Sequence, residues 1–448
     1  MGLSILFLLL YVAIVVIIGF VSSKKETEDG FMIAERKVQG FQVAATMSAG
    51  FFDGVTLAVY IAYIYQYGFS AIWLFVGLAI GFLFLRKYAW KIKQKGDEVK
   101  AYSMPEYFYR ILGKKNGLAF SFLLVFEFFL FLVVNLIISG KVLSAIFPIP
   151  YFLAVLIGGA IVLTYLLLAG FKAVVLTDFF QLIIMFVMSL SVGVFLFGKT
   201  SIPISEFNLG TLGIGNILGF LVLAGLGIMV APDLWQRIFA TKDEQNLKRG
   251  LGYTAAILPI LAIIISIVGL ATKQFFPNIL PEDALVAGFS GLLPFGLKEF
   301  GMILLYAVAL SSTDTAAFVV SSILTRDLKN YSKSYTDESM KKLARFFMIV
   351  FIAIAMLVAI FYQNILALGF SMASLNLMIF PIVFGSLYWK LKEKAVFWSL
   401  ILGFLSVVIL FAGNSFNPET SIIPLPVVLV SLLVFQKLFK TNPSPLPI

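Results

Sequence analysis

The chain has no cysteine and no histidine among its 448 residues. Without cysteine it can form neither a disulfide framework nor a thiolate metal site, and without histidine it lacks the usual general base and the commonest transition-metal ligand. Charged residues are also scarce, at 12%, whereas 61% of the residues are hydrophobic and the mean hydropathy is +1.02. The surface of a soluble domain needs far more charge than this. Composition therefore predicts a polytopic membrane protein.

Apolar stretches long enough to cross a bilayer recur along the whole chain, and we count about thirteen. They are expected at residues 2–23, 40–67, 69–86, 117–146, 150–169, 171–197, 212–237, 249–273, 299–325, 345–367, 369–389, 395–413 and 421–438. We expect the first to be a retained helix and not a cleaved signal peptide, because no Lys or Arg precedes it and Lys24 and Lys25 follow it. The chain is thus expected to be all-α, a single transmembrane domain over residues 1–448.

Basic residues separate between the two sides of this predicted topology. All of the 33 Lys and Arg residues fall in segments predicted inside, except Lys141, Lys199, Lys273 and Lys298. By the positive-inside rule, the N-terminus is expected outside and the C-terminus in the cytoplasm, within the cell membrane. The net charge of +10 is therefore read as a topology signal with some attraction to anionic lipid. It indicates neither nucleic-acid binding nor an obligatory protein partner.

One apolar segment, residues 305–327, contains five consecutive polar residues, Ser311-Ser312-Thr313-Asp314-Thr315. On a helix, Ser311, Asp314 and Thr315 share one stripe. A carboxylate and several hydroxyls at mid-membrane depth are costly unless they face a cavity, a partner or a bound ion. A single Ser more often only bonds to a neighbouring helix, but this cluster predicts a site.

Two predicted spans contain helix-breaking residues at matching places. The second has Gly50, Asp53 and Gly54 in mid-membrane, and the seventh has a Gly225/Gly227 pair followed by Pro232. Glycine also serves close helix packing, but matched breaks in two halves favour an inverted-repeat transporter with its site at the midplane.

At this point the chain resembles the sodium:solute symporter family. The stretches that carry the likeness are Ala34-Glu35-Arg36, Ser103-Met-Pro-Glu106-Tyr107, Leu168 to Gln181 with its Thr177-Asp178 pair, Pro232-Asp-Leu-Trp235-Gln236-Arg237, and Leu310–Asp327. The resemblance implies a LeuT-like core of two inverted five-helix repeats, with broken first and sixth core helices. The repeats would span residues 40–197 and 212–389, with an extra N-terminal helix at 1–23 and two C-terminal helices at 395–438.

The family implies no enzymatic activity but secondary active symport, in which inward sodium movement drives uptake of a small polar solute by alternating access. Carried over by motif, the shared Na⁺ site would use the carbonyls of Phe51, Gly54 and Val308 with the hydroxyls of Ser311 and Ser312. This set is chemically reasonable, because neutral oxygens bind a monovalent cation weakly enough to release it.

Some family members look to bind a second sodium with the counterpart of Asp178. The matching partners here are Ser311, Asp314 and Thr315, so one expected hydroxyl is replaced by a carboxylate. Of two nearby carboxylates, one tends to take a proton. A second sodium, a coupled proton and a structural role therefore remain open for this group.

The solute pocket is expected between the first, third, sixth and eighth core helices. Its candidate residues are Phe52, Asp53, Thr56, Glu127, Asn135, Ala224 and Ile228. Glu127 could pair with an amine of the solute, pair with Lys141, or face the inner vestibule. Asp233 with Arg237 is read mainly as a structural or gating ion pair. Proline-type members carry Trp and Tyr at the positions of Ala224 and Ile228, so proline is not assigned, and the solute could be an amino acid, a sugar or a carboxylate.

Three alternatives stand beside a sodium symporter. A proton-coupled transporter of the same fold and a transporter-like solute sensor or channel both share these residues. An intramembrane aspartyl protease would need a close pair of Asp residues in Y-D and G-x-G-D motifs, and Phe52-Asp53-Gly54 and Thr177-Asp178 match neither.

Overall fold

The computed structural model describes residues 2–22, 36–167, 171–331 and 336–439. These residues form helices connected by turns, with one isolated β-bridge between Val38 and Thr241. Ala34 and Glu35 of the first family motif, and residues 168–170 of the stretch from Leu168 to Gln181, lie outside the described residues. The helices are α1 Gly2–Ser22, α3 Gly40–Phe51, α4 Gly54–Tyr67, α5 Trp73–Glu98, α6 Met104–Ile146, α7 Tyr151–Leu166, α8 Phe171–Phe197, α9 Ile214–Gly227, α10 Pro232–Ala240, α11 Glu244–Phe275, α12 Ala284–Gly291, α13 Leu297–Tyr331, α14 Asp337–Phe361, α15 Ile365–Met378, α16 Phe380–Ser386, α17 Glu393–Ala412 and α18 Pro424–Leu438. The all-α class is confirmed.

The described helices support a multi-pass membrane protein. Nine of the described helical segments are long and apolar enough to cross a bilayer, or ten if α9 and α10 form one bent span. Each of the thirteen predicted spans overlaps at least one described helix, but thirteen crossings remain a prediction.

Both predicted helix breaks are present. α3 ends at Phe51 and α4 starts at Gly54, with Asp53 as the N-cap residue of α4. The Asp53 carboxylate accepts hydrogen bonds from the backbone N–H of Thr56 at 2.9 Å and from its hydroxyl at 2.8 Å. In the second half, α9 and α10 meet at an angle of 46° just before Pro232. At the first break, the Asp53 cap satisfies a backbone N–H that a broken helix would otherwise leave unpaired inside the membrane.

The connection between α14 and α15 differs from the sequence-based prediction. The loop expected between residues 367 and 369 instead lies at residues 362–364, between α14 and α15. Asn364 caps α15 there, because its side-chain oxygen accepts from the N–H of Ala367 at 2.8 Å. A short polar cap ends a helix without lowering the mean hydropathy of the long apolar run around it. Hydropathy alone therefore places this helix boundary too late.

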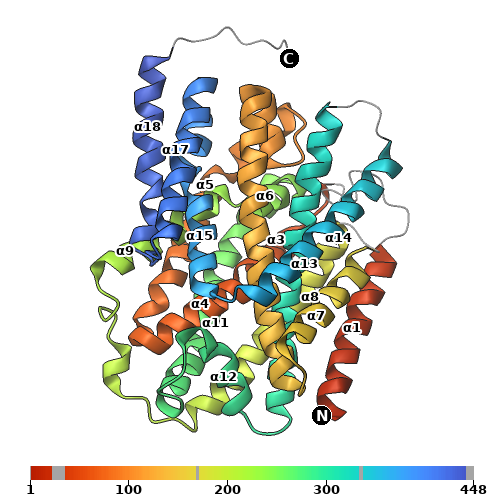
Figure 1. The fold of residues 1–448 in the computed structure, drawn as a ribbon, viewed down its shortest axis with the longest axis vertical. Coiled ribbons are helices and arrows are strands. Elements are labelled where there is room, and N and C mark those ends of the chain that lie inside the picture. The colour runs from red at the N-terminus through yellow and green to blue at the C-terminus, as the bar shows by residue number, and fades with distance from the viewer. Residues whose placement is uncertain (1, 23–35, 168–170, 332–335, 440–448) are drawn as a thin grey trace.

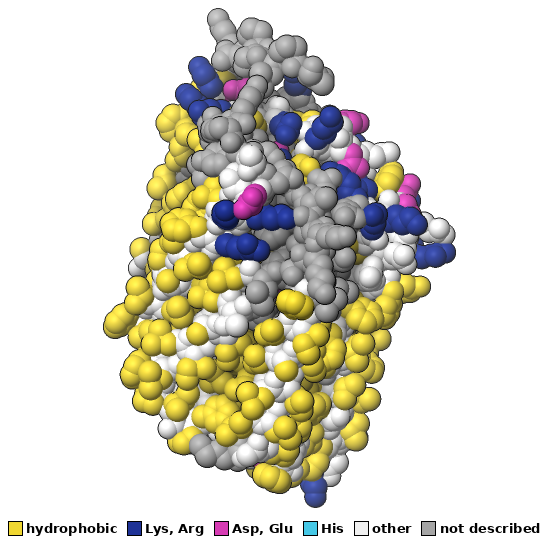
Figure 2. All heavy atoms as spheres, turned by 90° about the vertical axis from the view of Figure 1, so that its right-hand side faces the viewer, with side chains coloured by type: hydrophobic (Ala, Val, Ile, Leu, Met, Phe, Trp, Pro, Cys, Tyr) yellow, Lys and Arg dark blue, Asp and Glu magenta, His cyan; other side chains and the backbone are white. Residues whose placement is uncertain are grey.

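α6 packs along α13 through the middle of the bundle, and α11 packs against α3, α4 and α5. In Figure 1, α17 and α18 lie together at one edge, and α1 begins near the opposite end of the bundle from the end of α18. On the face shown in Figure 2, hydrophobic side chains cover a broad band, whereas Lys, Arg, Asp and Glu gather mainly at one end. Such a band is what the acyl chains of a bilayer would cover.

Candidate functional site

A cavity of about 90 Å³ lies where the break between α3 and α4 faces α6, α8, α10, α13 and α15. Its lining residues are Ala49, Gly50, Phe51, Asp53, Thr56, Glu127, Phe128, Phe131, Asp178, Ala231, Asp233, Ser311, Ser312, Thr315, Met372 and Asn376. Eight residues predicted from the sequence are among them: Phe51, Asp53, Thr56, Glu127, Asp178, Ser311, Ser312 and Thr315. The structure thus brings residues far apart in the sequence to one place beside the helix break.

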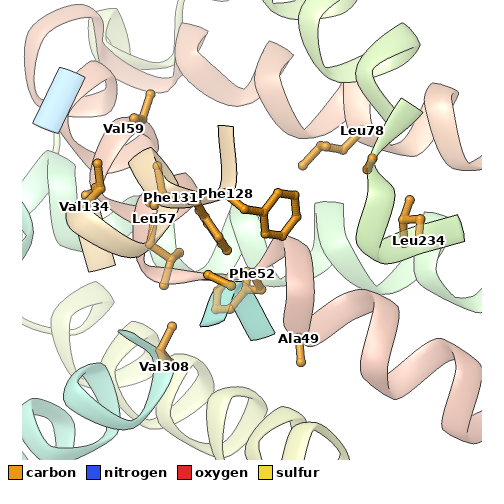
Figure 3. Close-up of a cluster of buried hydrophobic side chains, with 14 of the residues drawn as sticks. Ala49, Phe52, Leu57, Val59, Leu78, Phe128, Phe131, Val134, Leu234 and Val308 are labelled. Carbon is orange, nitrogen blue, oxygen red and sulfur yellow. The ribbon is translucent and has the colours of Figure 1, made fainter. Parts of the chain in front are cut away.

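The other predicted site residues lie outside this lining. They are Phe52, Gly54, Asn135, Ala224, Ile228, Val308 and Asp314. Phe52 is fully buried and its ring packs near that of Phe75, at a centroid distance of 6.2 Å. Figure 3 shows Phe52 among the hydrophobic side chains around the break, with Phe128 and Phe131 from α6. Ala224 and Ile228 are also buried, and Ala224 lies against Gly77 of α5.

Ser311 and Ser312, in the polar cluster of α13, have different hydrogen-bond partners. The Ser312 hydroxyl donates to the carbonyl of Val308 in its own helix at 3.1 Å, whereas the Ser311 hydroxyl donates to Asp178 on α8 at 3.1 Å. Asp314 is buried on the same helix and accepts from the hydroxyl of Thr315 at 3.4 Å. Ser311 and Ser312 therefore hold hydroxyl oxygens at the cavity, next to the end of α3.

Gly54 lies where the break comes close to both α6 and α13. A Cβ atom at this position would lie 2.6 Å from the side-chain oxygen of Asn135 and 3.3 Å from Cα of Ala309. Asn135 cannot readily move away, because its amide nitrogen donates to the carbonyl of Phe131 at 2.9 Å. The position therefore requires glycine for packing, and Asn135 supports the break although it does not line the cavity.

We expect Gly54→Ala to destabilise the protein by about 1–3 kcal/mol, because overpacking forces neighbouring groups to shift. The measurement is the apparent melting temperature of the purified protein in detergent. Gly225→Ala is the matched control, since a Cβ atom there meets nothing closer than a carbonyl oxygen at 3.6 Å. Equal melting temperatures for the two variants would contradict the expectation.

A buried ion network lies on one side of the cavity. Arg237 donates to Asp233 at 2.8 Å, to Asp178 at 3.2 Å and to the Thr46 hydroxyl at 2.9 Å. The Thr46 hydroxyl in turn donates to Asp178 at 2.5 Å. The predicted pair of Asp233 and Arg237 is confirmed, and one guanidinium ties α10 to α3 and α8. Sequence reasoning missed the tie to Asp178.

Glu127 stands apart from that network. Its side chain lines the cavity and is 3% exposed, and its Oε2 atom has no hydrogen-bond partner among the described residues. Pairing with Lys141 is wrong, because the Lys141 ammonium lies 2.6 Å from Asp283. Glu127 thus places a carboxylate at the cavity, and none of the described residues forms an ion pair with it.

Several lining residues were not predicted. Phe128 and Phe131 line the cavity with Glu127, and their spacing on a helix could have indicated a shared face. Asn376 is an isolated amide in the apolar helix α15, and it donates to the carbonyl of Gly227 at the end of α9, at 3.3 Å. An amide in an otherwise apolar span was a usable signal.

The cavity carboxylates do not form a divalent-metal site. Among the described residues, no three Asp or Glu side chains come together in a group that could hold a metal ion. Hydroxyl and carbonyl oxygens at a helix break suit a monovalent cation instead.

Comparisons with known proteins agree with this geometry. The model of the sodium:solute symporter family matches residues 31–403. The osmoregulated proline transporter OpuE of Bacillus subtilis is 26% identical over 89% of this chain and 87% of its own length. Sodium/proline symporter 2 of Staphylococcus saprophyticus is 25% identical over 90% of this chain and 84% of its own.

Solved structures show the same fold. A substrate-bound, outward-open Na⁺-coupled sialic acid symporter superposes with a TM-score of 0.83 at 18% identity, covering 99% of each chain. MhsT in complex with L-phenylalanine gives a TM-score of 0.51 at 12% identity, over 95% of this chain and 98% of its own. These likenesses confirm the LeuT-like fold, and the family model covers most of the sequence. The chain therefore belongs to the sodium:solute symporter family.

Proposed function

We propose that this protein is a secondary active symporter that couples inward sodium movement to uptake of a small polar organic solute by alternating access. Membership of the family makes it a transporter, not an enzyme, with sodium as the coupling ion. The observation that carries the proposal is one cavity, at a helix break, that is lined by Phe51 together with Ser311 and Ser312.

The proposed sodium site consists of the carbonyls of Phe51, Gly54 and Val308 and the hydroxyls of Ser311 and Ser312. Broken helices free backbone carbonyls that can coordinate Na⁺ without burying a full side-chain charge. Ser312 already lies 3.1 Å from the Val308 carbonyl oxygen. The Ser312 hydroxyl and the Val308 carbonyl, two of the five proposed sodium ligands, are therefore neighbours on α13.

For Asp178, Asp314 and Thr315 we propose a supporting role in place of a second sodium site. Asp178 accepts hydrogen bonds from Thr46, Ser311 and Arg237, so a guanidinium already compensates its charge. Through Ser311, this carboxylate would position the first sodium site.

We further propose that residues 40–197 and 212–389 are the inverted repeats, each opened by a broken helix. The helices at 1–23 and 395–438 would flank this core. The N-terminus would lie outside and the C-terminus in the cytoplasm, because nearly all Lys and Arg fall in segments predicted inside.

Sodium binding without solute tests the proposed site directly. We expect saturable ²²Na⁺ binding to the purified protein, weakened about tenfold or more in Ser312→Ala, because a ligating hydroxyl is lost. Ser321→Ala is the matched control, since its hydroxyl likewise donates to a carbonyl of its own helix, at 2.9 Å from Phe318, away from the cavity. Equal sodium affinity in both variants would rule out the proposed site.

A further inference from the structure

We infer that a groove beside the starts of α3, α8 and α11 binds an anionic phospholipid. The groove has a volume of about 470 Å³, within the usual range of ligand sites. Its described lining consists of residues 39–42 at the start of α3, Phe179 of α8, and Asn246, Arg249 and Tyr253 of α11. None of these residues lines the solute cavity, so the inference goes beyond the proposed function.

The groove lies where α3 and α11 enter the membrane-spanning part of the chain. Their first turns adjoin the basic segments 24–37 and 237–249, which are both predicted inside. Phe41 and Tyr253 in the groove lining are 58% and 50% exposed. Exposed aromatic rings beside basic residues are typical of the membrane–water interface. With the proposed orientation, the groove therefore faces the head groups of the cytoplasmic leaflet, which is the leaflet that carries anionic lipid.

Arg249 supplies the charge that selects an anionic ligand. Its side chain is exposed at the groove and forms no ion pair with the described residues. The nearby carboxylates are engaged elsewhere, because Glu244 pairs with Lys248 at 2.6 Å and Asp243 caps α11. No Asp or Glu is among the described lining residues. A guanidinium binds a phosphate through two parallel hydrogen bonds, and the hydroxyl of Tyr253, one turn further along α11, can donate a third.

Phe41 and Phe179 supply the surface that distinguishes a lipid from a soluble anion. Their rings meet edge to face, with centroids 5.7 Å apart. Both line the groove together with Arg249. An acyl chain can lie on this apolar wall while the phosphate of the same lipid meets the guanidinium. Inorganic phosphate would bind the guanidinium alone and leave the wall uncovered. The pairing of a guanidinium with an apolar wall therefore fits a phospholipid.

A lipid in this groove would contact both α3 and α11. The backbone N–H of Gly40 donates to the side-chain oxygen of Asn246 at 2.8 Å, and both residues line the groove. The site thus exists only where the two helices are packed together. A ligand that binds the folded protein and not the unfolded chain raises the melting temperature by mass action, so lipid binding can be measured as thermal stabilisation.

The test uses the full chain, purified and delipidated in dodecyl maltoside, a detergent with neither charge nor phosphate. The melting temperature is measured with dioleoyl-phosphatidylglycerol, with dioleoyl-phosphatidylcholine, which has the same acyl chains but no net charge, and with sodium phosphate. The variants are Arg249→Gln and Phe41→Ala, and each shift is taken relative to the same variant without lipid. Arg86→Gln and Phe346→Ala are the matched controls, because they make the same changes at an exposed arginine and an exposed phenylalanine outside the groove lining.

We expect phosphatidylglycerol to raise the melting temperature of the wild type by about 3 °C or more, phosphatidylcholine to raise it by less than half as much, and phosphate to leave it unchanged. Arg249→Gln and Phe41→Ala should each lose at least half of the phosphatidylglycerol shift, whereas Arg86→Gln and Phe346→Ala should keep it. Without lipid, Arg249→Gln should melt like the wild type, because Arg249 has no ion pair to lose.

Four results would each overturn the inference: equal shifts from the two lipids, no shift in the wild type, an unchanged shift in Arg249→Gln or Phe41→Ala, or the same loss in the control variants. A shift with sodium phosphate that depends on Arg249 but not on Phe41 would also overturn it, because it would identify a site for a soluble anion. None of these measurements involves sodium coupling or a solute, so their outcome is independent of the proposed function.

Discussion

Replacing Arg237 by glutamine is expected to lower the free energy of unfolding by about 3–5 kcal/mol and to abolish sodium-driven uptake. Arg237 is 2% exposed and compensates both Asp178 and Asp233, at 3.2 and 2.8 Å. Removing one partner of a buried ion pair leaves an uncompensated charge, which is strongly destabilising. Here two carboxylates lose their partner, and α10 loses its tie to α8.

The expected loss can be measured as a drop of about 5 °C or more in the apparent melting temperature of the purified protein. Arg237→Lys should recover little of it, because an ammonium cannot reproduce the three bonds that a guanidinium fork makes. The exposed Arg249 provides the matched control in Arg249→Gln. If Arg237→Gln melted within a degree of wild type, the network would not hold these helices together.

The second large effect is expected from Glu106→Gln. The Glu106 carboxylate accepts from Arg326 at 2.8 and 3.2 Å and from Arg110 at 2.8 Å, and its side chain is fully buried. It also accepts from the backbone N–H of Tyr102 at 3.0 Å, just before α6 begins. This pair joins the start of α6 to the far end of α13, the helix that carries Ser311 and Ser312.

A neutral amide at position 106 would remove the buried carboxylate charge that pairs with Arg326 and Arg110, so we expect a loss of about 3 kcal/mol or more. Melting temperature and sodium affinity should both fall. Glu338→Gln, which disturbs only an exposed pair with Lys342, should change neither. An unchanged melting temperature in Glu106→Gln would mean that this bridge contributes no net stability.

Sequence reasoning succeeded where the signal is local. Both breaks follow from glycine, proline and aspartate at fixed spacing, and Ser311 and Ser312 are conspicuous because they belong to five consecutive polar residues in an apolar segment. Both hydroxyls do line the cavity. Their role as sodium ligands remains a proposal.

What the sequence did not reveal is mostly which side of a helix faces which neighbour. Glu127 and Lys141 lie on the same helix, but fourteen residues put them about 21 Å apart, and the lysine pairs with Asp283 instead. The bond between Arg237 and Asp178 joins residues 59 positions apart, and hydropathy carries no information about such a contact. Ala224 was expected at the pocket from its place in the sixth core helix, but it packs against α5.

The most direct test of the account is uptake of radiolabelled amino acids, sugars and carboxylates into proteoliposomes under opposed gradients of sodium and potassium. The account predicts that an inward sodium gradient drives concentrative uptake, that an inward potassium gradient does not, and that collapsing the sodium gradient releases the accumulated solute. Concentrative uptake that ignores sodium but follows an imposed proton gradient would contradict it. That result would move the coupling ion from the hydroxyls of Ser311 and Ser312 to the carboxylates of Asp178 and Asp314.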